Sequence, residues 1–118
     1  MSDKARRVPA RLMDMREAIA NVRSDIGSLS KDEFLADGKT LRAVIESLIV
    51  IGEAANIILR VDPDLQQRVP DAWRSLREAY DMRIVLTHEY FRIDAAIVWD
   101  TVKNDLPALD ALVESLLD

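Results

Sequence analysis

The sequence has no cysteine, a single histidine, and few glycines, prolines or aromatic residues. Its 118 residues include 3 Gly, 4 Pro, 2 Trp, 2 Tyr and 2 Phe. Without cysteine there are no disulfides, thiolate zinc sites or cysteine nucleophiles. With His88 as the only histidine, a multi-histidine metal site within one chain is also excluded. The low Gly and Pro content argues against a β-sandwich or barrel, because these folds need many turns. We expect no metal and no cofactor.

Long apolar runs are also missing. The first apolar segment is interrupted by Arg11, Asp14 and Arg16, so it does not resemble a signal peptide. No run approaches the roughly 18–20 apolar residues that span a bilayer. The length suits one domain, residues 1–118, with a core of its own. We therefore expect a soluble, cytoplasmic protein that does not contact a membrane.

The net charge of −5 at first argues against a nucleic-acid partner. The charge is uneven, however: residues 93–118 carry −5 by themselves, and residues 68–92 carry +1. The basic residues are 12 Arg and only 4 Lys. Arginine suits surface ion pairs, and it also binds phosphate in a bidentate manner. Because phosphate binding depends on local contacts, the total charge does not exclude an RNA partner.

Helical periodicity dominates the first half of the chain. Apolar residues spaced three and four apart predict a helix that ends at Gly27, and residues 30–33 form a capping box that opens a short helix. A long helix is expected over residues 40–60. It has two adjoining apolar stripes, and small residues at Gly52, Ala54 and Ala55 would allow another helix to approach closely.

Residues typical of helix starts divide the second half of the chain into several helices. Asp62 and Pro63 predict the start of a short helix, with Asp62 as its N-cap. Pro70 opens a further helix, and Asp94 caps the next one. Pro107 either kinks that helix or opens another. No strand is expected, so the fold class is an all-α bundle of four or five main helices.

One segment, residues 82–91, carries side chains suited to chemistry. Histidine transfers protons near neutral pH, arginine stabilises charge on a phosphate, and the segment offers His88, Arg83 and Tyr90. Without a metal this set suits RNA cleavage, in which the 2′-hydroxyl is the nucleophile. On one straight helix Arg83 and His88 would point about 140° apart. Either the helix loosens near His88, or two subunits complete the site. The structural alternative is a capping histidine and an arginine in a surface ion pair.

Several blocks of the sequence resemble the HepT-like family of HEPN-domain proteins. The hallmark of that family is Arg, four to six residues, His, any residue, Tyr, which is matched here by Arg83, His88 and Tyr90. The flanking blocks that carry the resemblance are Ile51–Ala55, Trp73, Met82, Leu86, Glu89, Phe91 and Ile97–Pro107. The resemblance covers nearly the whole chain.

The resemblance implies a homodimeric HEPN bundle that acts as a metal-independent endoribonuclease, the toxin of a type VII-like toxin–antitoxin pair. It implies that Arg83 contacts the scissile phosphate and that His88 transfers protons. Glu53 and Thr87 are further candidates, as supporting residues. Tyr90 would lie at the site edge. The implied antitoxin is a minimal nucleotidyltransferase that silences the enzyme by transferring AMP to Tyr90, which adds charge and bulk.

Other interpretations remain open. Ile84 stands where HEPN nucleases commonly carry a polar residue, and this favours a non-catalytic HEPN module that binds a nucleotidyltransferase. A plain helical dimerisation domain is a third possibility. A solvated face is favoured for Glu53 over a pair with Arg83. For Trp73 and Trp99, packing in the core or at an interface is favoured over base stacking. For Arg6, Arg7 and Arg11, a frayed basic terminus is favoured over contacts with RNA phosphates.

Overall fold

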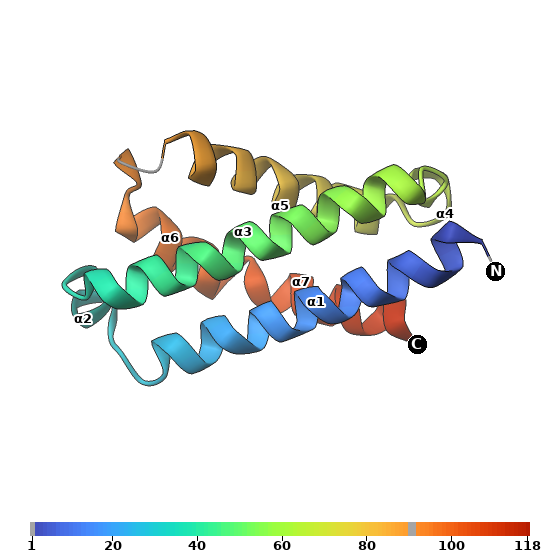
Figure 1. The fold of residues 1–118 in the computed structure, drawn as a ribbon. Helices are drawn as coiled ribbons and strands as arrows, with labels where there is room; N and C mark the ends of the chain where they lie inside the picture. Colours follow the sequence, from blue (N-terminus) through green and yellow to red (C-terminus); the bar gives the residue numbers. More distant parts are fainter. Residues whose placement is uncertain (1, 90–91) are drawn as a thin grey trace.

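The computed structural model describes residues 2–89 and 92–118, and within these ranges the chain forms seven helices and no strand (Figure 1). The predicted all-α class is confirmed. The helices are α1 (Asp3–Ile26), α2 (Lys31–Leu35), α3 (Gly38–Val61), α4 (Leu65–Arg68), α5 (Pro70–His88), α6 (Ala95–Asn104) and α7 (Leu106–Leu117). Five of them form the bundle, and α2 and α4 are short connecting helices.

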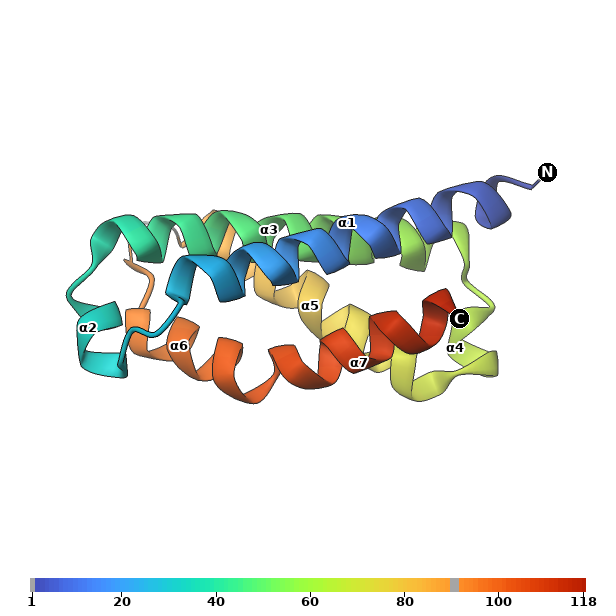
Figure 2. The same cartoon turned by 90° about the horizontal axis from the view of Figure 1, so that it is seen from below.

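The two longest helices, α1 and α3, run antiparallel and form the centre of the bundle (Figure 1). Helix α5 packs beside α3, and α6 and α7 lie in line beneath α1 and α3 (Figure 2). Both apolar stripes predicted for the long helix are buried, as befits a helix with neighbours on several sides. The largest fully buried side chains come from five of the helices: Leu12, Met15, Ile19, Val22, Phe34, Val44, Ile58, Leu76, Leu86 and Val113.

Most predicted helix boundaries are confirmed. Gly27 ends α1 with a φ of 53°, a left-handed conformation that favours glycine. The Ser30 hydroxyl and the Glu33 carboxylate form the reciprocal capping box of α2. Asp94 accepts a hydrogen bond from the Ala96 N–H at the start of α6. Pro107 lies in the first turn of α7, so it opens a new helix.

The basic N-terminal segment is helical, contrary to the expectation of a frayed terminus. Helix α1 begins at Asp3, whose carboxylate pairs with Arg6 at 3.4 Å and with Arg7 at 3.0 Å. Arg11 pairs with Asp14 at 3.0 Å. The Ser2 hydroxyl also accepts a hydrogen bond from the Ala5 N–H. These local contacts extend the helix beyond the apolar stripe from which it was predicted.

The prediction that Asp62 caps a short helix was wrong. Asp62 follows the last residue of α3, and α4 begins only at Leu65. The Asp62 side chain is buried, and both of its carboxylate oxygens accept hydrogen bonds from Arg68 at 3.0 Å. Lys4 of α1 also lies 3.1 Å from this carboxylate. Asp62 therefore joins the start of α1 to the α3–α4 connection, a tertiary contact that overrides its capping preference.

We predict that Asp62→Asn lowers the free energy of unfolding by about 1–3 kcal/mol at neutral pH, because charge-assisted hydrogen bonds are lost. The Arg68 hydrogen bonds lower the pKa of Asp62 in the folded protein. The stabilisation is therefore fully present above the unfolded pKa of 3.8 and is lost as the pH falls through the folded pKa. Urea unfolding from pH 7 to pH 2 measures this. The exposed Asp71–Arg74 pair supplies the control, since Asp71→Asn should change little. Equal effects of the two variants would contradict the prediction.

No helix in the described ranges is both long enough and apolar enough to cross a membrane.

Candidate functional site

Helix α5 carries both predicted catalytic side chains. Pro70 starts the helix at a position that needs no N–H donor, and Ala72, Leu76 and Leu86 fix its buried face. The helix continues without a break to His88, where the Glu89 N–H closes it on the Val85 carbonyl. Of the two alternatives raised by the sequence, loosening of the helix before His88 does not occur.

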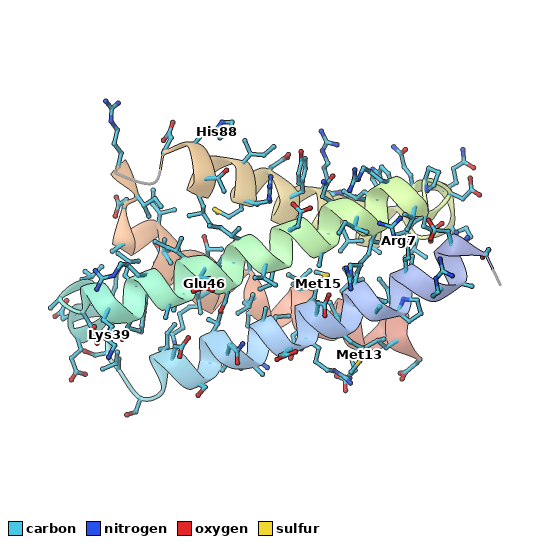
Figure 3. The ribbon with its side chains drawn as sticks, in the orientation of Figure 1. Arg7, Met13, Met15, Lys39, Glu46 and His88 are labelled. Carbon is cyan, nitrogen blue, oxygen red and sulfur yellow. The ribbon has the colours of Figure 1, made fainter. Side chains whose placement is uncertain are left out.

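Because α5 is unbroken, Arg83 and His88 lie on different sides of it. Five residues advance the helix by about 500°, which leaves the two side chains about 140° apart. Arg83 faces α3, whereas His88 is exposed on the outer side of α5 (Figure 3). A single subunit therefore does not bring these two side chains together.

Arg83 forms an ion pair with Glu53 of α3. The distance from Arg83 Nε to Glu53 Oε2 is 3.0 Å, and the two side chains are 30% and 44% exposed. The Nε atom is buried, and the carboxylate lies outside the direction of its N–H, so the contact is ionic and not a regular hydrogen bond. The pair of Glu53 with Arg83, which the sequence favoured less than a solvated face for Glu53, is thus present. It leaves the Arg83 side chain partly exposed beside α3.

Gly52 explains how α5 reaches α3 at this point. A Cβ atom at Gly52 would lie 2.3 Å from Arg83 Cβ and 2.8 Å from the Ala79 carbonyl oxygen. No side chain larger than hydrogen fits unless the helices move apart. The close approach predicted from the small residues of α3 is confirmed, and the neighbour that needs the space is Arg83.

The remaining predicted residues take different places. The Thr87 hydroxyl shares its single proton between the carbonyl oxygens of Arg83 at 3.0 Å and Ile84 at 3.1 Å. Thr87 thus contacts the backbone of the Arg83 turn. Ile84 is half-buried on α5. Tyr90 lies outside the residues that the structure describes. Within the described ranges no three His, Asp or Glu side chains are grouped as metal ligands.

The sequence analysis missed a cluster on α5 in which two arginines lie near one aromatic ring. The guanidinium carbon of Arg77 lies 5.9 Å from the centre of the Tyr80 ring, and that of Arg83 lies 6.0 Å from it. These distances lie at the outer limit of cation–π contacts. The spacing of Arg77, Tyr80 and Arg83, three residues apart on one helix, was the signal that could have indicated the cluster.

The all-α bundle is consistent with the HEPN fold that the sequence resembles. Its fifth helix carries Arg83 beside α3 and an exposed His88. A family model described as "Ribonuclease HepT-like" matches residues 15–116. The chain belongs to this family of ribonucleases.

Individual similar proteins also carry the names of ribonucleases. A Thermococcus cleftensis protein named "Probable ribonuclease HepT" is 37% identical over 105 residues, which cover 89% of this chain and 91% of the relative. A Methanocaldococcus jannaschii protein named as an RNase is also 37% identical, over 101 residues that cover 85% of this chain and 78% of the relative. No solved structure matches the chain.

Proposed function

We propose that the protein is a metal-independent endoribonuclease whose site combines Arg83 of one subunit with His88 of a second. The observation that carries the proposal is the ion pair of Arg83 and Glu53 beside Gly52, which holds a partly exposed arginine side chain against α3. Family membership supports RNA as the substrate. The experiment that tests the proposal is cleavage of an RNA oligonucleotide in EDTA.

The chemistry needs only the RNA and these side chains. The 2′-hydroxyl attacks the adjacent phosphorus and gives up its proton, and the bond from phosphorus to the 5′-oxygen breaks. The leaving 5′-oxygen takes up a proton, which yields a 2′,3′-cyclic phosphate and a 5′-hydroxyl. His88 is the residue suited to move these protons, and Arg83 is suited to stabilise the added charge on the phosphate. Glu53 would position Arg83.

The divergence of Arg83 and His88 supports a homodimer, because a second subunit could bring the two kinds of side chain together. The surface around His88 also suits a protein contact, because Val85 is 51% exposed and Ile84 lies one helical turn before His88. Paired about a twofold axis, two such segments would place each His88 opposite the partner's α5. Light scattering that shows a monomer at tens of micromolar would contradict the dimer.

We predict that two inactive variants restore activity when mixed. If Arg83 and His88 act across the interface, a dimer of one Arg83→Ala and one His88→Ala subunit has one intact site and one doubly defective site. After subunits are exchanged at random, about half the dimers are mixed, so about one quarter of wild-type cleavage should return. A mixture that stays as inactive as its components would show that both residues act within one subunit.

Within the same proposal, the protein is the toxin of a toxin–antitoxin pair, and a minimal nucleotidyltransferase silences it. The α-phosphorus of ATP would bond to the Tyr90 hydroxyl oxygen with loss of pyrophosphate and a proton. The added adenylyl group brings negative charge and bulk next to His88 in the sequence, which would oppose RNA binding. Family resemblance supports this part of the proposal.

We predict that incubation with the neighbouring nucleotidyltransferase and ATP adds the mass of AMP to the wild-type chain and not to Tyr90→Phe. Intact-mass spectrometry gives the readout. The treated wild type should also lose RNA cleavage, whereas treated Tyr90→Phe should keep its untreated rate. Equal addition of mass to both proteins would remove Tyr90 as the target.

A second candidate function rests on Ile84. An apolar residue directly after Arg83 offers no hydrogen bond to RNA, and this favours a non-catalytic module that binds the nucleotidyltransferase. The two candidates separate in the EDTA assay, because the module would cleave no RNA and would still form a stable complex with the nucleotidyltransferase.

A further inference from the structure

The outer face of α5 carries a row of aromatic and charged side chains that leads to His88. We define the α5 outer strip as Trp73, Arg77, Tyr80 and His88. At 100° per residue these four side chains project within about 80° of one another. Arg77 and His88 are eleven residues apart, so they differ by about 20° in direction and about 16 Å along the axis. The strip therefore lies on one side of α5, which also carries Ile84 between Tyr80 and His88, and it ends at the proposed catalytic histidine.

The two aromatic side chains of the strip are neither fully buried in the core nor fully exposed to solvent. Trp73 and Tyr80 are both half-buried, with one side packed against the core. This anchoring holds each ring in place at little further cost in conformational entropy when a ligand stacks on it. Packing accounts for only part of each ring, and the remaining part faces solvent.

Arg77 lies between the two rings in the sequence and is available to a phosphate. Its side chain is 59% exposed, and its nearest carboxylate is Asp81, at 3.6 Å from Nε. A surface pair of this kind contributes little, so a phosphate can replace it. The Arg77 guanidinium also lies over the Tyr80 ring, which keeps it beside the strip.

We propose that the α5 outer strip binds the single-stranded RNA next to the cleavage point, with Arg77 on a backbone phosphate and a base stacked on Tyr80. An arginine between anchored aromatic rings is the combination by which proteins hold single strands without reading their sequence. The proposal rests on the proposed ribonuclease function and adds the direction of the substrate, which runs from His88 toward the α4 end of α5.

The test measures binding separately from cleavage. The probe is a fluorescein-labelled 2′-O-methyl RNA of about twelve nucleotides, within the usual range for single-strand sites, which cannot be cleaved because it lacks a free 2′-hydroxyl. Fluorescence anisotropy gives its Kd at several salt concentrations. Arg77→Gln should weaken binding and lower the slope of log Kd against log salt by about 0.7, the value for one lost phosphate contact.

The matched control is Arg16→Gln on α1. Arg16 is also exposed, and its carboxylate partner Glu114 lies at a similarly long 3.8 Å. This variant should leave Kd and slope unchanged. If Arg16→Gln and Arg77→Gln give the same change, the binding is a general effect of charge and the strip is not the site.

Tyr80 and Asp81 provide independent readouts. Tyr80→Leu should raise Kd about 5- to 100-fold without changing the salt slope, whereas Tyr80→Phe should keep the wild-type Kd because it keeps the ring. Asp81→Asn should lower Kd by freeing Arg77, and it should do so less when Arg77 is already Gln. Wild-type Kd in Tyr80→Leu would overturn the stacking role, and an equal gain from Asp81→Asn in both backgrounds would overturn the role of Arg77.

The outcomes separate this proposal from the one on which it rests. If the wild type cleaves RNA, and Arg77→Gln and Tyr80→Leu do not change RNA binding, the ribonuclease proposal stands. The α5 outer strip is then rejected as the RNA-binding site. Absence of both cleavage and RNA binding in the wild type would reject both proposals.

Discussion

Replacing His88 with alanine is expected to slow RNA cleavage by about 10²- to 10⁴-fold, the usual contribution of a general acid or base. His88 is the only histidine of the chain, so no second imidazole can take over its role. Its side chain is exposed at the end of α5, and the thermal unfolding of the variant should therefore match the wild type. Cleavage rates of a fluorogenic RNA substrate in EDTA measure the effect.

The adjacent residue gives a matched control for this variant. Glu89 is exposed and follows His88 at the helix end, and Glu89→Gln changes a charge at the same place without removing an imidazole. This control should retain wild-type cleavage. Unchanged cleavage by His88→Ala would remove His88 from the mechanism, and the same loss in both variants would assign the effect to the helix end.

The periodicity of the sequence was sufficient to predict the bundle. Apolar spacing of three and four residues located the buried faces, and side chains such as Ser30 and Asp94 marked helix starts because capping depends only on near neighbours. The prediction failed at Asp62, where the Asp-Pro pair has the local features of a cap. Its carboxylate is instead held by Arg68 and Lys4, and Lys4 lies at the opposite end of the long α1–α3 stretch of sequence.

The site was harder to predict because it, too, depends on contacts between residues far apart in the sequence. The sequence placed Glu53 on a polar stripe of α3, but nothing in that stripe shows that α5 passes beside it. Gly52 indicated a close approach without identifying the neighbour, which the structure shows to be Arg83. Tyr80 follows the helical spacing of a core residue, and its contacts with the guanidiniums of Arg77 and Arg83 depend on side-chain directions that a one-dimensional pattern does not contain.

Gly52→Ala is expected to disturb stability and cleavage together. The new methyl group would lie 2.3 Å from Arg83 Cβ and 2.8 Å from the Ala79 carbonyl oxygen, and neither atom can move without the α5 backbone. Overpacking of this kind costs about 1–3 kcal/mol of unfolding free energy. A shift of about 1 Å in α5 would also displace Arg83 from Glu53, and a misplacement of that size can cost about 10²-fold in rate.

Gly38→Ala separates this effect from a general effect of adding alanine to α3. Gly38 lies at the start of the same helix, and its Cβ would meet only Arg42 Nη1, at 3.3 Å, which is the far end of a flexible side chain. Because alanine also favours helix over glycine, Gly38→Ala should keep or slightly raise the unfolding free energy and leave cleavage unchanged. Chemical unfolding and cleavage by the folded fraction measure the two effects separately. If folded Gly52→Ala cleaves RNA at the wild-type rate, the close contact of α3 and α5 serves packing alone, and the placement of Arg83 beside Glu53 has no part in the reaction.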